Sequence, residues 1–232
     1  MIGNHLFDSP NLIQSLLDER QMSMEEALTV VRNLAPIQPM LDVQIMKATM
    51  APHGGDAKAV KPATALRALR LVSSISNGSR LTSSLVRLLQ HPTAEVRSKA
   101  VLLLGRANLN LTRVRSFLGS CDSRVRANAV ETLWGRHEPD VRAVLWEASK
   151  DPHGRVAVNA LLGLCKAGDP EAALKLEKLA GSPDAVVRSS SAWAMGEAGN
   201  TEFLPVLQML AQDQDEKVRA MGTKSLAKLE SV

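Results

Sequence analysis

Residues 124–133, RVRANAVETL, decide the fold of this 232-residue chain. Arg124, Val125 and Arg126 open a helical pattern there, and a valine in the same setting recurs along the chain. The valines are Val96, Val125, Val156, Val187 and Val218. Their successive spacings are 29, 31, 31 and 31 residues. A nearly constant period of this size predicts a repeat protein, in which each unit packs on its neighbours in the sequence.

Three more positions repeat in register with the valine. An aliphatic residue stands eleven residues before it, a small residue four after it, and a leucine or methionine eight after it. These are Leu85, Val114, Leu145, Leu176 and Leu207; Ala100, Ala129, Ala160, Ser191 and Gly222; and Leu104, Leu133, Leu164, Met195 and Leu226. Residues at i, i+4 and i+8 form one stripe of a helix. The stripe predicts that the small residue admits a neighbouring helix and that the leucine fills the layer between units.

Each unit is expected to consist of two helices joined by a short turn. Proline stands in the turn at Pro92, Pro152 and Pro183, where it blocks continuation of the preceding helix. After a helix over 62–76, we predict first helices over 81–90, 110–119, 139–149, 170–181 and 201–211, and second helices over 94–107, 123–136, 154–167, 184–198 and 215–229. The repeat array is therefore predicted to cover residues 61–232.

Residues 1–60 do not follow the period. Helices are expected to start near Pro10, Ser23 and Pro39, and residues 52–56 are expected to form a loop. A repeat array needs an atypical unit that covers its first apolar face. We therefore predict that 1–60 form an irregular helical N-terminal cap, with a small adaptor as the alternative.

The turn before each second helix carries a pattern of Asp or Ser, Pro, three variable residues, Val and Arg. It is strongest in DPHGRVA (151–157), SPDAVVR (182–188) and DQDEKVR (213–219), and weaker in HPTAEVR (91–97) and SCDSRVR (120–126). Over residues 62–230 the chain resembles the HEAT-repeat family, in particular the short bacterial version called phycobilisome-lyase-like HEAT repeats. The resemblance implies an all-α, right-handed α-solenoid (superhelix) of about five to six helical pairs. It also implies that the second helices line a concave face and that the protein binds partners rather than performing chemistry.

The composition favours a soluble, cytoplasmic protein with an aliphatic core. Aromatic residues make up 3% of the chain and hydrophobic residues 45%. Cys121 and Cys165 have no metal-binding or redox spacing and are expected to be buried thiols in a reducing compartment. No apolar stretch reaches the roughly 18 residues that a membrane span requires, and the N-terminus shows no signal-peptide pattern. We therefore expect no membrane partner.

The net charge of +4 is unevenly distributed along the chain. Residues 57–126 contain 13 Lys or Arg residues but only two acids, Glu95 and Asp122. The basic residues expected on second helices are Arg67, Arg70, Arg97, Lys99, Arg106, Arg124 and Arg126, and those on or beside first helices include Arg80, Arg87, Arg113 and Arg115. Phosphates need only positive charge at suitable spacing, so nucleic-acid binding through 57–126 is one alternative. The segment lacks aromatic stacking platforms apart from Phe117, and an acidic protein partner is the other alternative.

The arginine that follows the valine forms a ladder in the sequence, which Ala157 interrupts. The ladder consists of Arg97, Arg126, Arg188 and Arg219. In a structural interpretation, the arginines pair with acids of the turns, Asp151 or Asp213, and tie the units together. In a functional interpretation, they are exposed to an anionic groove.

Trp134 and Trp193 are expected on second helices and Trp146 on a first helix. Filling of the core is the simpler role for all three. A second-helix tryptophan on the concave face would instead be a binding anchor, because tryptophan is enriched at interface hot spots. The hypothesised partner-binding set is therefore Arg97, Arg126, Trp134, Arg188 and Trp193.

We predict no catalytic, cofactor-binding or metal-binding site. His137-Glu138 is the only His-Glu pair, whereas deoxyhypusine hydroxylase, another protein built from such repeats, holds iron with several. The sequence contains no Gly-rich phosphate loop and no GxSxG motif. The expected function is a non-catalytic protein-protein interaction scaffold. A bilin-lyase-like chaperone or enzyme subunit is a further alternative that the resemblance alone supports.

Overall fold

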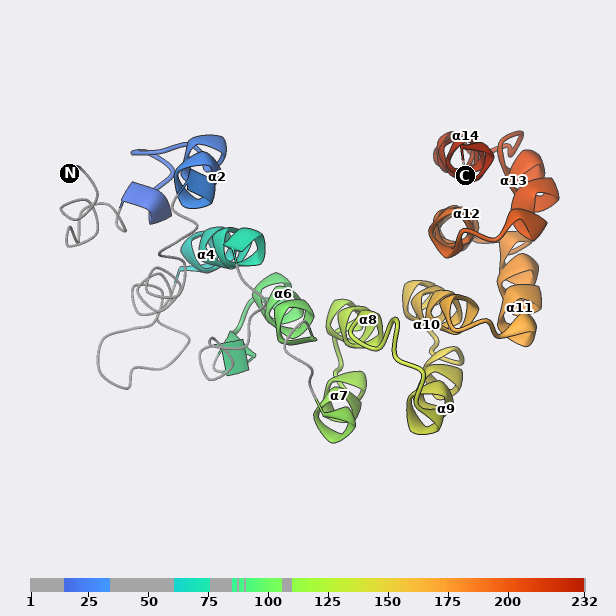
Figure 1. The fold of residues 1–232 in the computed structure, drawn as a ribbon, viewed down its shortest axis with the longest axis horizontal. Helices are drawn as coiled ribbons and strands as arrows, with labels where there is room; N and C mark the ends of the chain where they lie inside the picture. Colours follow the sequence, from blue (N-terminus) through green and yellow to red (C-terminus); the bar gives the residue numbers. More distant parts are fainter. Residues whose placement is uncertain are drawn as a thin grey trace. The chain divides into compact units, whose positions relative to one another are not determined.

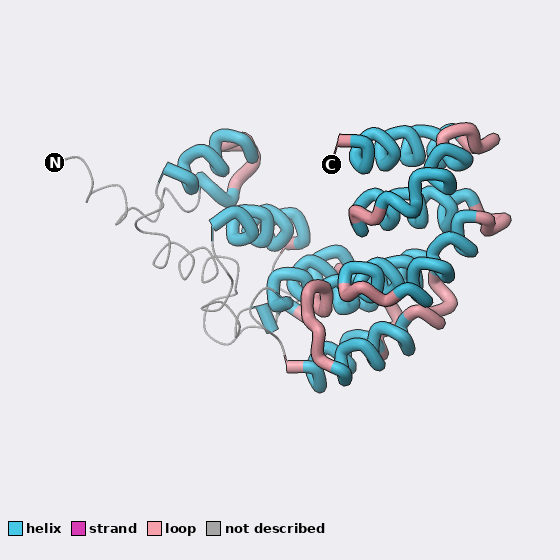
Figure 2. Tube along the Cα trace, turned by 45° about the vertical axis from the view of Figure 1, so that its right-hand side comes forward, coloured by secondary structure: helices cyan, strands magenta, loops and turns pink. Residues whose placement is uncertain are grey.

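The computed structural model describes residues 15–33, 61–75, 85–86, 88–89, 91–105 and 110–231. Within these ranges the regular structure is helical and no strand is present (Figure 2). No helix in the described ranges is long and apolar enough to cross a membrane. The all-α class is thus confirmed. The chain divides into two compact units, Met1–Asn110 and Leu111–Val232, and the predicted boundary near residue 60 stays a prediction.

The helices described in the first unit are α2 (Met24–Asn33), α4 (Pro62–Ile75) and α6 (Ala94–Gly105), of which α2 packs on α4 and α4 on α6. A capping box opens α2: the Ser23 hydroxyl accepts the Glu26 N–H at 3.2 Å, and the Glu26 carboxylate accepts the Ser23 N–H at 2.9 Å. Hydrogen bonds from the hydroxyl and then the amide of Ser23 lower the pKa of Glu26. The helix expected from Ser23 is therefore present. The expected helix from Pro10 is described only at residues 15–17, and the one from Pro39 lies outside the described residues.

The second unit is a series of helical pairs. Its first helices are α7 (Leu111–Leu118), α9 (Pro139–Ala148), α11 (Pro170–Ala180) and the 3-10 turn η4 (Thr201–Phe203) with α13 (Leu204–Leu210); its second helices are α8 (Ser123–Glu131), α10 (Gly154–Lys166), α12 (Ala185–Ala198) and α14 (Glu216–Glu230). The second helices lie side by side in chain order along the inner side of this curved unit, and the first helices lie outside them (Figure 1). We call the inner surface of α8, α10, α12 and α14 the second-helix face.

Two helix boundaries differ from the expected ones for local reasons. The expected helix over 123–136 ends at Glu131, because the next amides bond three residues back rather than four: Leu133 N–H to the Val130 carbonyl at 2.9 Å and Trp134 N–H to the Glu131 carbonyl at 3.2 Å. The expected helix over 201–211 is divided into η4 and α13. Pro205, at the start of α13, has no N–H to donate to the preceding turn.

The valine stripe forms the core, as the periodicity predicts. Val96, Val125, Val156 and Val218 are buried, and so are all five aliphatic residues eleven positions earlier. Val187 is the exception and is half-buried. It lies against Gly154 at the start of α10, where a Cβ would stand 2.6 Å from a Val187 methyl carbon.

The small residue four positions after the valine lets a helix pack closely on its neighbour, as expected. At Gly222 in α14, a Cβ would lie 2.6 Å from the backbone nitrogen of Ala211 and 2.7 Å from the carbonyl carbon of Leu210. Neither backbone atom can move aside without shifting α13, so only glycine fits at this depth. Gly199, with φ of 73°, ends α12 in the left-handed region that glycine favours.

The cysteines are placed differently from one another. Cys165 near the end of α10 is half-buried, and burial raises the pKa of its thiol to about 12, with a further contribution from the negative charge of Asp169. Cys121 is exposed in the turn before α8. The prediction that both thiols are buried is therefore wrong for Cys121, because a turn residue beside a helix N-terminus faces the surface.

Candidate functional site: the second-helix face and its arginine spine

Arg126, near the start of α8, connects two successive turns. Its Nη1 donates to the carbonyl oxygens of Ser120 at 2.8 Å and Cys121 at 3.3 Å, in the turn before its own helix. Its Nε and Nη2 donate to the two carboxylate oxygens of Asp151, in the next turn, at 2.7 and 3.0 Å. A bidentate pair fixes geometry as well as adding attraction. The Arg126 and Asp151 side chains are only 15% and 12% exposed, so this pair is part of the stack.

Arg188 of α12 repeats the arrangement two units later. Its Nη1 donates to the carbonyl oxygens of Ser182 and Pro183, at 2.9 and 3.1 Å. Its Nε and Nη2 donate to the two carboxylate oxygens of Asp213, both at 2.8 Å. These are the pairs that the structural interpretation of the ladder expects. We call these two arginine–aspartate pairs, with the turn carbonyls that they bind, the arginine spine.

The other two ladder arginines also bind the turn before their own helix. Arg97 Nη1 donates to the carbonyl oxygens of His91 and Pro92, at 2.8 and 2.7 Å. Arg219 Nη1 donates to those of Asp213 and Gln214, at 2.7 and 2.9 Å. Each described arginine of the ladder therefore satisfies carbonyl groups that precede a helix, where no intrahelical donor reaches them.

Hydrogen bonds keep both spine carboxylates ionised. Asp213 accepts from Arg188 and from the Asp215 amide, and these bonds lower its pKa to about 2. Burial raises the pKa of Asp151, but hydrogen bonds from Arg126 and from the His153 amide outweigh burial, so the pKa lies below its ordinary value. The spine is therefore fully charged at neutral pH.

Arginine and aspartate are absent together from the interrupted unit. Ala157 stands at the arginine position of α10, and 25 residues later, where Arg126 and Arg188 each find an aspartate, the chain has Ser182. The Ser182 hydroxyl still accepts the Asp184 N–H at 3.2 Å, as the spine aspartates do for the amides of their own turns. The turn thus needs only a side-chain acceptor, and the carboxylate serves the arginine.

Arg67 of α4, which the sequence alignment places at the ladder position, is fully buried. Its guanidinium donates to the carbonyl oxygens of Leu16 at 2.6 Å, of Ser23 at 3.2 Å and of Met22. Its Nη1 lies 4.0 Å from a Glu19 carboxylate oxygen. Arg67 therefore connects α4 to the residues before α2. Its partners, 44 to 51 residues away, follow no repeat and could not be inferred from spacing.

Trp134 and Trp193 meet beside α10, although they come from helices on its two sides. Their ring centroids are 6.2 Å apart with a tilt of 39°. Trp134 Nε1 donates to the Asn159 carbonyl oxygen at 2.9 Å, and a Cβ on Gly163 would stand 2.7 Å from the Trp134 ring. The Lys166 ammonium lies 4.9 Å from the Trp134 centroid, within cation–π range. Both indoles are half-buried, so each keeps a surface that solvent can reach.

Trp146 lies on α9, among the first helices. Its Nε1 donates to the Asp169 carboxylate at 3.1 Å, and the Lys175 ammonium stands 4.2 Å from its ring centroid. Arg142 completes the cluster with an ion pair to Asp169 at 2.8 Å. Trp146 is also half-buried. The expectation that the tryptophans fill the core is therefore wrong for all three: each lies at a junction between helices, with one polar or cationic neighbour.

The predicted partner-binding residues do not form one cluster. Trp134 and Trp193 come together, whereas Arg126 and Arg188 belong to the spine and Arg97 lies in the other unit. Two residues of the tryptophan site were missed: Gly163 and Lys166. A glycine inside a helix of good helix formers usually has a packing reason, and that signal in α10 could have identified Gly163.

The basic residues proposed for nucleic-acid binding have several different roles. Arg67 is buried and Arg126 is paired, whereas Arg70, Arg113, Arg115 and Arg124 are exposed. Arg80, Arg87 and Arg106 lie outside the described residues. The exposed arginines are divided between the two units, so the charge of segment 57–126 does not correspond to one described surface.

His137-Glu138 is involved in a local contact. The Glu138 carboxylate accepts from Arg136 Nη2 at 3.0 Å. Its pKa is lowered by a backbone hydrogen bond and then by Arg136. In the described part of the chain, no group of three or more His, Cys, Asp or Glu residues could hold a metal ion.

Comparison with known proteins gives one family and several folds. Residues 111–195 and 174–232 match the family model of HEAT repeats. No curated protein sequence matches the chain. Similar solved structures include YibA of Escherichia coli, with 13% identity, coverage of 98% of this chain and 84% of the other, and a TM-score of 0.49.

Two further structures resemble the chain over most of its length. Human deoxyhypusine hydroxylase in complex with glycerol has 17% identity, 95% coverage of both chains and a TM-score of 0.44. An engineered protein has 18% identity, coverage of 96% of this chain and 98% of the other, and a TM-score of 0.36. All three TM-scores are below 0.5, so nothing about function follows from these likenesses.

Proposed function

This chain belongs to the HEAT-repeat family, and from that premise we propose that it is a non-catalytic scaffold that binds a protein partner on its concave second-helix face. The observation that carries the proposal is the Trp134–Trp193 pair. Two indoles with centroids 6.2 Å apart form the largest aromatic surface among the described residues of a chain with 3% aromatic residues. Tryptophan is the residue most enriched at interface hot spots.

The chemistry around the pair favours an acidic partner. Trp134 uses its indole N–H on the Asn159 carbonyl oxygen, but Trp193 has no hydrogen-bond acceptor for its N–H among the described residues. A carbonyl or carboxylate oxygen of a partner would satisfy this donor. The Lys166 side chain is exposed beside the Trp134 ring and provides a positive charge next to the aromatic surface. An apolar side chain flanked by a carboxylate therefore matches the pair.

The spine supports the proposal by holding the face in one shape. Arg126–Asp151 and Arg188–Asp213 each join two turns, and the Trp134 indole is itself anchored on α10. A preformed surface loses little conformational entropy when a partner binds, so more of the contact energy appears as affinity. On this proposal the arginines of the predicted binding set act indirectly, through rigidity.

Site-specific photo-crosslinking in the native host tests the proposal. p-Benzoylphenylalanine would replace Ala167, which is exposed at the end of α10, or, as the control, Leu174 of α11, which is 67% exposed among the first helices. We expect a discrete protein to be cross-linked from Ala167 and not from Leu174. Introducing Trp193→Ala should remove that product.

Three outcomes would count against a protein partner on this face. The first is cross-linking only from Leu174. The second is a product from Ala167 that persists at full yield with Trp193→Ala. The third is cross-linked material that is nucleic acid, bound in a manner that weakens steeply as salt rises, which would favour the basic-segment alternative.

A further inference from the structure

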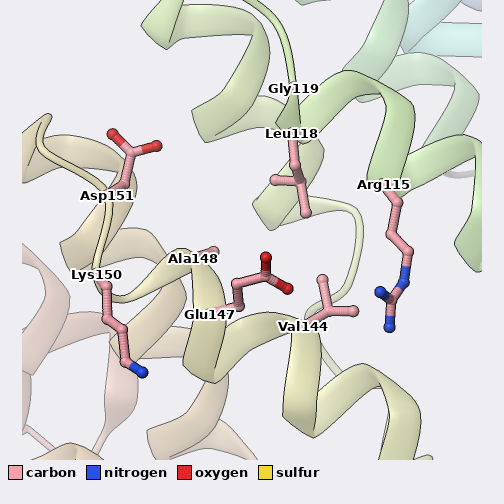
Figure 3. A pocket seen from close by; sticks show the side chains of 8 residues that line it. All are labelled: Arg115, Leu118, Gly119, Val144, Glu147, Ala148, Lys150 and Asp151. Atoms are coloured by element: carbon pink, nitrogen blue, oxygen red, sulfur yellow. The ribbon is translucent and has the colours of Figure 1, made fainter.

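A hollow of about 400 Å³ opens between α7 and α9, on the first-helix side of the second unit (Figure 3). It is lined by Leu118, Gly119, Val144 and Ala148, with Arg115, Glu147, Lys150 and Asp151 around them. The floor is apolar and the surroundings are charged. The hollow is separate from the second-helix face, so its role can be tested independently of the proposed function.

Alignment of the repeats explains why the space is there. The position eight residues before the repeat valine is occupied by Leu88, Phe117, Ala148, Leu179 and Leu210. Ala148 is the one small residue in this series. Leu88 and Leu210 are fully buried, which shows that a large side chain belongs in the core at this position. In α9 that side chain is missing.

Gly119 enlarges the same space from the α7 side. A Cβ built on Gly119 would meet only the Ser116 carbonyl oxygen, at 3.6 Å, and nothing else within 4 Å outside its own chain neighbours. The hollow therefore has room for a side chain at both of its walls. Because the adjacent units fill the equivalent position with Phe117 or Leu179, a side chain of that size and character fits.

The charges around the hollow are available to a ligand. Both carboxylate oxygens of Asp151 accept from Arg126. Arg115, Glu147 and Lys150 are exposed and take part in no ion pair or hydrogen bond between side chains in the described structure. Figure 3 shows Arg115 and Lys150 on opposite sides of the hollow, with the Glu147 carboxylate between them. A chain that crosses the hollow would thus meet a cation on either side and an acceptor in the middle.

We propose that this hollow docks a leucine or phenylalanine side chain from an acidic segment of a protein partner. The docked side chain takes the place that Leu179 and Phe117 take in the neighbouring units. Carboxylates on either side of it pair with Arg115 and Lys150. The Glu147 carboxylate accepts the backbone N–H of the docked residue. Peptide recognition here is a replacement in trans of a core side chain that α9 lacks.

A blocked pentapeptide, acetyl-Asp-Glu-Leu-Glu-Asp-amide, is the probe. Its binding would be followed by methyl NMR of the full chain, at the Leu118 and Val144 methyl groups that line the hollow. We expect saturable shifts of these signals at millimolar peptide or below. A peptide with central alanine, or with lysines for the acids, should bind at least tenfold more weakly. Absence of saturable shifts at these methyl groups with the acidic leucine peptide would overturn the proposal.

Two protein variants locate the binding. Ala148→Leu fills the hollow from within and should weaken peptide binding at least tenfold, while Ala143→Leu, an exposed alanine of the same helix, should leave it unchanged. Arg115→Glu with Lys150→Glu leaves the hollow open and should produce a similar loss by charge alone. Wild-type affinity in Ala148→Leu, confirmed as folded by circular dichroism, would contradict docking in the hollow. Wild-type affinity in the double charge variant would contradict the carboxylate contacts.

Discussion

Removing Arg126 from the spine should destabilise the second unit by an amount that depends on Asp151. Arg126→Met keeps the apolar stem of the side chain but removes two hydrogen bonds to the carboxylate, at 2.7 and 3.0 Å, and two to turn carbonyls. Hydrogen bonds to charged groups contribute about 1.5–3 kcal/mol and neutral ones about 0.5–1.5 kcal/mol. The 12–15% exposure of the pair reduces these values, because water partly replaces the lost partners. We expect a loss of about 2–3 kcal/mol.

A double-mutant cycle with Asp151→Asn separates the pair from its surroundings. Asp151→Asn alone should cost about 1–2 kcal/mol, and the coupling energy between the two changes should be about 1–2 kcal/mol. Urea unfolding followed by circular dichroism would give the free energies. In thermal unfolding, Arg126→Met should lower Tm by about 5–10 °C for a chain of this length.

Arg155→Met is the matched control for the cycle. Arg155 lies in the turn between the two spine residues in neither ion pair nor described hydrogen bond, and it is exposed. Its replacement should change the stability by no more than about 0.5 kcal/mol. A coupling energy below about 0.3 kcal/mol for Arg126 and Asp151, or an equal loss in Arg155→Met, would refute the role given to the spine.

Three other perturbations test separate parts of the structure. The Asp213 pKa of about 2 lies below its ordinary 3.8, so its ion pair stabilises the fold above about pH 4 and is lost as the pH falls through about 2; calorimetry should show a flatter fall of Tm over that window in Asp213→Asn than in wild type, and equal slopes would contradict it. Gly163→Val should cost about 2 kcal/mol and weaken the exciton signal of the tryptophans in near-ultraviolet circular dichroism, because its Cβ would stand 2.7 Å from the Trp134 ring; an unchanged spectrum would argue against the contact. Exposed Cys121 should react quickly with a disulfide reagent at pH 8, whereas Cys165, with a pKa of about 12, should react only on unfolding; two equally fast thiols would be the contrary result.

Periodicity in the sequence was enough to predict the helices of the second unit. Each second helix there starts within about one residue of its expected position, since the turn residue, valine and small residue recur at fixed spacing. The spine could be predicted for the same reason: Asp151 and Asp213 each follow their arginine by 25 residues. Local pattern and repeated packing agree here, so one unit informs the next.

Features that break the repeat could not be predicted from it. Trp134 and Trp193 stand nine and six residues after their valines, and they meet only because α8 and α12 converge around α10, which depends on how the units curve. The partners of Arg67 lie in a segment with no period. The hollow at Ala148 is an intermediate case, because the missing side chain can be seen in the aligned sequence, although the open space cannot.

The affinity of the protein captured from Ala167 for wild type and for Trp193→Ala tests the role of the tryptophan pair most directly. Trp146→Ala, the same substitution among the first helices, is the control, and circular dichroism confirms that each variant is folded. Isothermal titration calorimetry should give a Kd at least about 30-fold higher for Trp193→Ala, which corresponds to a hot spot of about 2 kcal/mol. The Kd of Trp146→Ala should stay within about threefold of wild type, since that substitution lies outside the binding face. Equal Kd values for wild type and Trp193→Ala would contradict binding on the second-helix face.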